Sequence, residues 1–220
     1  MDTFRTEEEQ VEAIKSWWKE NGTSTLVTIA VAIAIVVGWR GWQDRQVEGT
    51  AAASALYQSL FQMEQQLSVE PNDEDQATAN HLTEQLKESH ENSAYARYAA
   101  LLKSKRSAQS GDLDTAETEL LWALDHTDGT ILSEDDLPLR DLLQLRLAKV
   151  FMAQEKFDQA QTALGEIVAK QFVAMAQEVE GDILFAQGEI AKAKEQYQIA
   201  IDNQDRVGST EVLRIKMSNL

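Results

Sequence analysis

Hydrophobic positions near the N-terminus form one unbroken run. Residues 23–39 contain no charged side chain. Extended to Trp42, the stretch is about 20 residues, or roughly 30 Å of helix, which matches the hydrocarbon thickness of a bilayer. Arg40 lies within this extension, where a long cationic side chain near a helix end can reach the membrane interface. The pattern predicts a transmembrane helix over residues 23–42.

Tryptophans bracket the apolar run. Trp17 and Trp18 precede it, and Trp39 and Trp42 close it. Tryptophan is enriched at membrane–water interfaces because its ring is apolar and its N–H is polar. We therefore expect these four residues, together with Arg40, to lie at the two interfaces.

Two other interpretations of the run are a buried core helix and a cleaved signal peptide. Core stretches are usually shorter, and a signal peptide has a short basic leader and small residues at the cleavage site. Here the segment before the run is 22 residues long and acidic, and the run ends in Gly-Trp-Arg-Gly-Trp. These features favour an uncleaved anchor. The small excess of basic residues on the N-terminal side favours a cytoplasmic N-terminus.

The pattern after residue 42 is helical. Apolar residues at Ala52, Leu56, Leu60, Met63 and Leu67 share one face of a helix. Similar stripes continue to the C-terminus, and glycine and proline are scarce. We predict an all-α chain in three parts: a short tail with an amphipathic helix over 1–22, the anchor over 23–42, and a helical domain over 43–220.

Three segments of this domain resemble one another. Each has a turn, then an apolar residue, a small alanine three positions later and a large apolar residue four further on. These packing residues are Leu113, Ala116 and Leu120, then Phe157, Ala160 and Leu164, then Ile190, Ala193 and Tyr197. The pattern resembles the tetratricopeptide repeat, whose period is about 34 residues. It predicts a helical-repeat solenoid, with an irregular helical bundle as the alternative.

The net negative charge of the chain makes some classes of partner unfavourable. The chain has a net charge of −17, and residues 43–220 hold 31 acidic and 16 basic side chains, a net charge of −15. Such a domain repels nucleic acid and anionic lipid surfaces. Cysteine is absent, which excludes disulfides and thiolate chemistry. The short basic run over residues 103–106 is interpreted as a solvated surface.

No sequence motif indicates catalysis. The three histidines, His81, His90 and His126, lack metal-ligand spacing. We expect no enzyme activity, no cofactor, no metal site and no catalytic residue. Stacked helical pairs instead form a groove suited to polypeptides. Candidate partner-binding residues come from the first helices of pairs: Tyr95, Tyr98, Gln144 and Gln177.

The order of features resembles the YfgM family, ancillary subunits of the SecYEG translocon. The resemblance rests on residues 9–15 (Glu-Gln-Val-Glu-Ala-Ile-Lys), residues 20–22 (Glu-Asn-Gly), the closing residues 38–40 (Gly-Trp-Arg) and the helical pairs. It implies a single-pass protein of the bacterial inner membrane with a cytoplasmic N-terminus and a periplasmic repeat domain. It also implies association with SecYEG, with the membrane-anchored periplasmic chaperone PpiD, and with translocated polypeptides that pass to folding factors. The alternatives are a scaffold for envelope assembly and a stress regulator that holds a cytoplasmic partner.

Overall fold

The computed structural model describes residues 49–128, 137–203 and 207–218, and a few single residues before them: Lys15, Lys19, Ile35 and Trp39. The chain divides into two compact units, Met1–Ala51 and Ala52–Leu220. In the first unit the four single residues are helical, and Ile35 and Trp39 are exposed. Among the residues described, no helix has both the length and the apolar character to cross a membrane. The predicted anchor, apart from Ile35 and Trp39, lies outside these residues.

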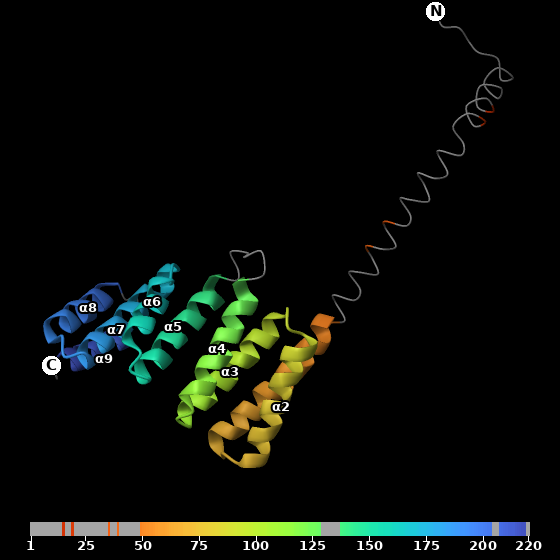
Figure 1. The fold of residues 1–220 in the computed structure, drawn as a ribbon, viewed down its shortest axis with the longest axis horizontal. Coiled ribbons are helices and arrows are strands. Elements are labelled where there is room, and N and C mark those ends of the chain that lie inside the picture. Colours follow the sequence, from red (N-terminus) through yellow and green to blue (C-terminus); the bar gives the residue numbers. More distant parts are fainter. Residues whose placement is uncertain are drawn as a thin grey trace, which may run out of the picture. The chain divides into compact units, whose positions relative to one another are not determined.

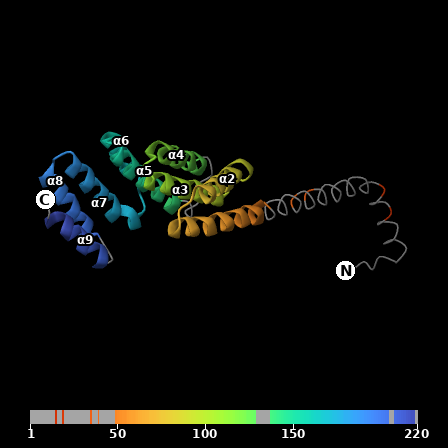
Figure 2. The ribbon, with the colours of Figure 1, turned by 90° about the horizontal axis from the view of Figure 1, so that it is seen from below.

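The second unit is built of helices wherever it is described, which confirms the all-α prediction. After a helix that ends at residue 69, the helices follow one another in chain order (Figure 1, Figure 2). They are α2 (Asp73–Ser89), α3 (Ala94–Gln109), α4 (Leu113–Asp128), α5 (Leu137–Ala153), α6 (Phe157–Gly165), α7 (Lys170–Ala186), α8 (Ile190–Asp202) and α9 (Val207–Ser218). The most extensive packing is within the pairs α3–α4, α5–α6 and α7–α8.

The same turn closes each of these three pairs. Its central residue has a positive φ: 85° at Gly111, 60° at Glu155 and 80° at Gly188. In each turn, the next residue donates its N–H to the carbonyl five positions earlier, at 2.9, 2.8 and 2.8 Å. This arrangement is the common way to end a helix with a left-handed residue. The three segments that resemble one another in sequence therefore also share one backbone geometry.

Polar side chains fix where two of the first helices begin. The side chain of Asn72 accepts a hydrogen bond from Asp75 N, at 2.8 Å, at the start of α2. Ser93 Oγ accepts one from Ala96 N, at 3.1 Å, at the start of α3. Each cap satisfies a backbone N–H that has no partner within the helix.

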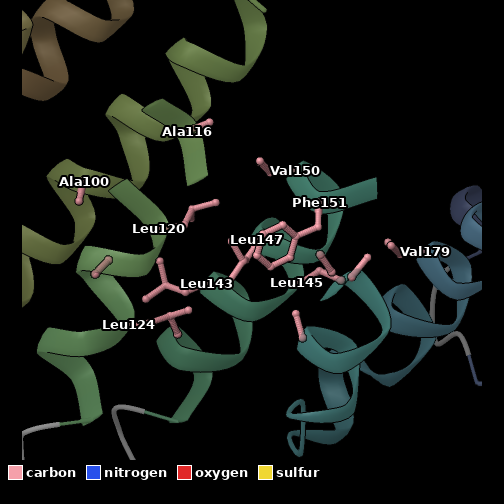
Figure 3. Close-up of a cluster of buried hydrophobic side chains, with 14 of the residues drawn as sticks. Ala100, Ala116, Leu120, Leu124, Leu143, Leu145, Leu147, Val150, Phe151 and Val179 are labelled. Carbon is pink, nitrogen blue, oxygen red and sulfur yellow. The ribbon is translucent and has the colours of Figure 1, made fainter. Parts of the chain in front are cut away.

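Three clusters of buried side chains form the core. The first lies among the helix ending at residue 69, α2 and α3, the second extends from α3 to α7, and the third joins α7, α8 and α9. Figure 3 shows the middle cluster, where Leu120, Leu143 and Phe151 meet between the pairs. Complete burial of a side chain such as Leu120 or Leu143 contributes about 1.5–3 kcal/mol.

Small residues allow neighbouring helices to approach closely. Ala116, Ala160 and Ala193 are completely buried. Gly181 of α7 lies against the ring of Tyr197 of α8, where an added Cβ would come within 2.6 Å of Tyr197 Cε1. The Tyr197 hydroxyl donates to Asp182 Oδ1 at 2.7 Å, and Lys216 of α9 donates to the same carboxylate. These contacts join the last three helices.

One buried carboxylate connects successive pairs. Asp141 of α5 is completely buried, and its Oδ2 accepts the N–H groups of Val168 and Ala169, at 3.0 and 2.6 Å. Ala169 precedes α7 and has no capping side chain of its own. Asp141 therefore performs the role of a cap from a different helix, and fixes where α7 starts relative to α5.

Candidate protein-binding surface

Aromatic rings gather where α3 packs beside the helix that ends at residue 69. The Tyr57 ring centroid lies 6.4 Å from that of Phe61, 5.6 Å from that of Tyr95 and 6.1 Å from that of Tyr98. Phe61 and Tyr98 remain 46 % and 38 % exposed. Burial, and then the nearby Tyr98, raise the pKa of the Tyr57 hydroxyl above its usual value. Exposed aromatic groups of this kind are typical of surfaces that bind other proteins.

The aromatic cluster continues along one side of α3. Tyr95, Tyr98, Leu102, Lys105 and Gln109 follow one another at intervals of three and four residues, so they share one side of the helix. We call these five residues the α3 face. Two of them, Tyr95 and Tyr98, are residues that the sequence suggested for partner binding.

A groove lies between α3 and α5 at the C-terminal end of the α3 face. Its volume is about 510 Å³, within the range of about 300–1,000 Å³ that is usual for binding clefts. The residues that line it are Leu101, Leu102, Ser104, Lys105, Ala108, Gln109, Leu113, Arg146, Lys149, Val150 and Ala153. The lining combines aliphatic side chains with three cations and contains no carboxylate.

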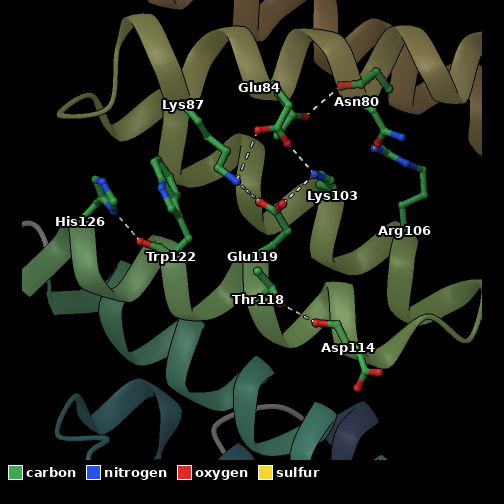
Figure 4. A network of polar contacts seen from close by, with 12 residues as sticks. Asn80, Glu84, Lys87, Lys103, Arg106, Asp114, Thr118, Glu119, Trp122 and His126 are labelled. Carbon is green, nitrogen blue, oxygen red and sulfur yellow. Dashed lines mark hydrogen bonds and ion pairs between the residues drawn. The ribbon is translucent and has the colours of Figure 1, made fainter.

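Opposite charges hold the helices around the α3 face together (Figure 4). Glu119 of α4 is buried and accepts from Lys87 of α2 at 2.8 Å and from Lys103 of α3 at 2.7 Å. Lys103 also pairs with Glu84, at 2.6 Å. Burial lowers the pKa of Lys103, but its hydrogen bonds to Glu119 and Glu84 outweigh this effect and raise it above the usual value. A buried carboxylate needs such partners, because desolvation without them costs several kcal/mol.

The basic run over residues 103–106 is therefore only partly a solvated surface, and that interpretation needs correction. Lys103 pairs with Glu84 and Glu119, and Arg106 pairs with Glu64 of the preceding helix. Ser104 is buried. The sequence alone could not show this, since the acidic partners come from three different helices.

The histidines do not converge. His81 is exposed on α2 and His90 ends that helix. The His126 ring stacks on Trp122, with ring centroids 3.9 Å apart, and its Nδ1 lies 2.8 Å from the Trp122 carbonyl oxygen. In the part of the chain that the structure describes, no three histidine, aspartate or glutamate side chains are grouped as metal ligands.

The other residues suggested by the sequence lie apart from the α3 face. Gln144 is half-buried on α5 and does not line the groove. Gln177 of α7 lines a separate pocket of about 390 Å³ beside α6 and α8, and accepts a hydrogen bond from Asn203. Among the packing residues, Ala116, Leu120, Ala160, Ala193 and Tyr197 are buried, while the remaining four are half-buried: Leu113, Phe157, Leu164 and Ile190. Trp17, Trp18, Arg40 and Trp42 lie outside the described residues.

Sequence reasoning missed the basic side of the groove. Lys105 belongs to a run that was interpreted as solvated, and the groove's other two cations, Arg146 and Lys149, stand 41 and 44 positions further along the chain. Their spacing of three residues on α5 places them on one side of that helix. This spacing could have indicated a basic side of α5. Only the folded structure shows that this side lies near Lys105 of α3 and lines the same groove.

The chain is similar along its whole length to known proteins. A model of the tetratricopeptide repeat-like domain family matches residues 15–220. A protein of Haemophilus influenzae, described as an ancillary SecYEG translocon subunit, is 31 % identical over 214 residues, which cover 97 % of each chain. Proteins with the same description from Neisseria gonorrhoeae and Escherichia coli K12 are 26 % and 24 % identical, with coverage of 97 % or more of each chain. No solved structure matches the chain significantly.

Proposed function

Because the chain belongs to the family of ancillary SecYEG translocon subunits, we propose that it is an adaptor that binds polypeptides beside the translocon. The observation that carries this proposal is the similarity over 97 % of both chains to a protein with that description. Similarity that includes the N-terminal region as well as the repeats supports a common arrangement, and not only a common repeat.

The proposed arrangement follows the three parts of the sequence. Residues 1–22 form a cytoplasmic tail, residues 23–42 form a single membrane span with Trp17, Trp18, Trp39, Arg40 and Trp42 at its interfaces, and residues 43–220 form a periplasmic repeat domain. The long uncharged run over residues 23–39 supports the span. An anchor beside a channel raises the effective concentration of the domain for chains that emerge there, even where each contact is weak.

The repeat domain acts by binding and without catalysis in this proposal. Its partners are SecYEG, the membrane-anchored periplasmic chaperone PpiD, and translocated polypeptides that pass to periplasmic folding factors. The exposed rings of Tyr98 on the α3 face and of Phe61 beside it support a role in protein binding. The net charge of −15 over residues 43–220 keeps this domain away from anionic lipid and nucleic acid.

Co-purification tests the proposal. The full chain and a version without residues 1–42 are purified from gently solubilised membranes, and the bound proteins are identified by mass spectrometry. We expect SecYEG with the full chain only, since the anchor would contact the channel, and a periplasmic chaperone with both. Recovery of envelope-assembly proteins or of a cytoplasmic regulator, without SecYEG, would reject the translocon function in favour of one of the two alternatives.

A further inference from the structure

We propose that the groove between α3 and α5 binds acidic polypeptide segments in which carboxylates alternate with apolar side chains. This inference rests on the proposed function, because it names the kind of chain that the repeat domain receives. It combines two observations: the three cations at the groove form no ion pair within the described residues, and most of the remaining lining is aliphatic.

Most cations of this acidic domain are already paired. In residues 52–128, 137–203 and 207–218, ion pairs involve Lys87, Lys103, Arg106, Arg140, Lys156, Lys192, Arg214 and Lys216. In contrast, Lys105, Arg146 and Lys149 form no ion pair or hydrogen bond through their side chains within these residues. All three line the same groove.

Unpaired cations gathered in one place are unusual in a domain with a net charge of −15. Acidic groups outnumber basic ones almost two to one between residues 43 and 220, so a random cation would commonly find a carboxylate close by. The lining of the groove nevertheless contains no aspartate or glutamate. The groove is thus a positive site on an otherwise negative domain, and it attracts anionic groups.

The electrostatic surroundings of Lys149 would favour a bound anion. Burial lowers its pKa, the neighbouring Arg146 lowers it further, and Glu178 and Asp182 only partly compensate. A carboxylate bound in the groove would replace lost hydration and balance the repulsion between Lys149 and Arg146.

The aliphatic lining determines which anion fits. Leu101, Leu102, Leu113 and Val150 supply apolar surface beside the cations. An inorganic anion or a nucleic-acid backbone would leave this surface uncovered, whereas a peptide with leucine-like side chains between carboxylates would cover it. The α3 face continues from the groove to Tyr98 and Tyr95, which gives an extended chain further surface for contact.

An anionic membrane is a poorer match. Its headgroups would have to approach a domain that carries a net charge of −15, and repulsion acts over a Debye length of about 10 Å at 0.1 M salt. A single flexible segment can enter the groove without bringing other negative charge near the rest of the domain.

Fluorescence anisotropy tests the inference with the full chain in nanodiscs of zwitterionic lipid, and with empty nanodiscs as the blank. The probe is a short fluorescein-labelled peptide of alternating aspartate and leucine. We expect saturable binding that weakens with rising salt. Peptides of alternating lysine and leucine, or aspartate and serine, should bind at least about tenfold more weakly, because each lacks one of the two complementary features.

Charge reversal locates the site. The double variant Arg146→Glu/Lys149→Glu should weaken probe binding at least about tenfold, and Lys105→Gln about two- to fivefold, as for a single exposed charge. The matched control is Lys170→Glu/Lys194→Glu, which changes net charge by the same amount at two exposed lysines outside the groove. It should change affinity less than about twofold. Circular dichroism melts of all variants establish that each is folded.

Other outcomes overturn the inference. Absence of saturable binding, equal loss in both double variants, or displacement of the probe by phosphatidylglycerol vesicles but not by excess unlabelled peptide would each do so. The last result would identify a lipid site. The inference is separable from the proposed function, because Arg146→Glu/Lys149→Glu should still co-purify with SecYEG. Loss of SecYEG from the parent chain would instead reject the proposed function itself.

Discussion

Replacement of Glu155 by glycine should stabilise the repeat domain. Glu155 occupies the turn position that glycine holds in the other two pairs, with φ of 60°. For a residue with a Cβ, this left-handed conformation lowers the stability of the folded state by about 1–2 kcal/mol. Glycine removes that strain. It also gives the unfolded chain more conformational freedom, which lowers stability by about 0.4–1 kcal/mol. The Glu155 side chain is exposed and forms no ion pair within the described residues, so we expect a net gain of about 0.5–1 kcal/mol.

Thermal melts followed by far-UV circular dichroism measure this effect. A change of 1 kcal/mol shifts the melting temperature by about 2–4 °C for a domain of this size. Glu155→Ala is the matched control, since it removes the same carboxylate but keeps the strained backbone, and should leave the melt almost unchanged. Gly111→Ala and Gly188→Ala should each destabilise by about 1 kcal/mol. Equal melting temperatures for Glu155→Gly, Glu155→Ala and the parent chain would refute the equivalence of the three turns.

Three further changes test other parts of the domain. Asp141→Ala should lower the free energy of unfolding by about 2–4 kcal/mol in urea titrations, because two backbone N–H groups lose their side-chain acceptor. Gly181→Ala should cost about 1–2 kcal/mol in the same assay, because the new Cβ overlaps the Tyr197 ring. Burial raises the pKa of Glu84, but the hydrogen bond from Lys103 and nearby positive charge outweigh this and lower it. The parent should therefore lose stability as pH falls through that lowered pKa, and Glu84→Gln should reduce the loss.

Two substitutions on the same domain serve as controls. Glu195→Ala removes an exposed carboxylate of α8 and should change stability by less than about 0.5 kcal/mol. Gly165→Ala adds a Cβ with no neighbour within 4 Å and should not destabilise. If Gly181→Ala lowers the free energy of unfolding no more than Gly165→Ala does, the close packing of α7 on α8 is contradicted. Identical pH profiles for Glu84→Gln and the parent would contradict the ion pair, and a cost below about 0.5 kcal/mol for Asp141→Ala would contradict its capping role.

Local patterns predicted much of the helical architecture. Apolar residues at intervals of three and four define a helix whatever it packs against, and cap residues such as Asn72 and Ser93 mark a start through bonds to their own helix. Two of the repeated turns were also predictable, because glycine at Gly111 and Gly188 readily adopts the positive φ that ends the preceding helix. At the third turn only the surrounding pattern pointed to Glu155.

Contacts between distant segments were not predictable in the same way. Asp141 would look like an ordinary polar residue of a helix, yet it caps the start of α7, which lies 28 residues further on at Ala169. The groove likewise depends on Lys105 and Lys149, which lie on different helices. For the candidate site, the sequence suggested Tyr95 and Tyr98 from their place on the first helix of a pair. It gave no reason to connect them with cations from α5.

Site-specific photo-cross-linking on the α3 face would show most directly whether the repeat domain receives polypeptides at the translocon. A photoreactive amino acid replaces Tyr98, or Lys194 of α8 as the control, in the full chain in membranes that are translocating a secreted protein. We expect cross-links from position 98 to the translocating chain or to a periplasmic chaperone, and few from position 194. Equal labelling from both positions, or none to either partner from position 98, would contradict the assignment of this face to polypeptide binding.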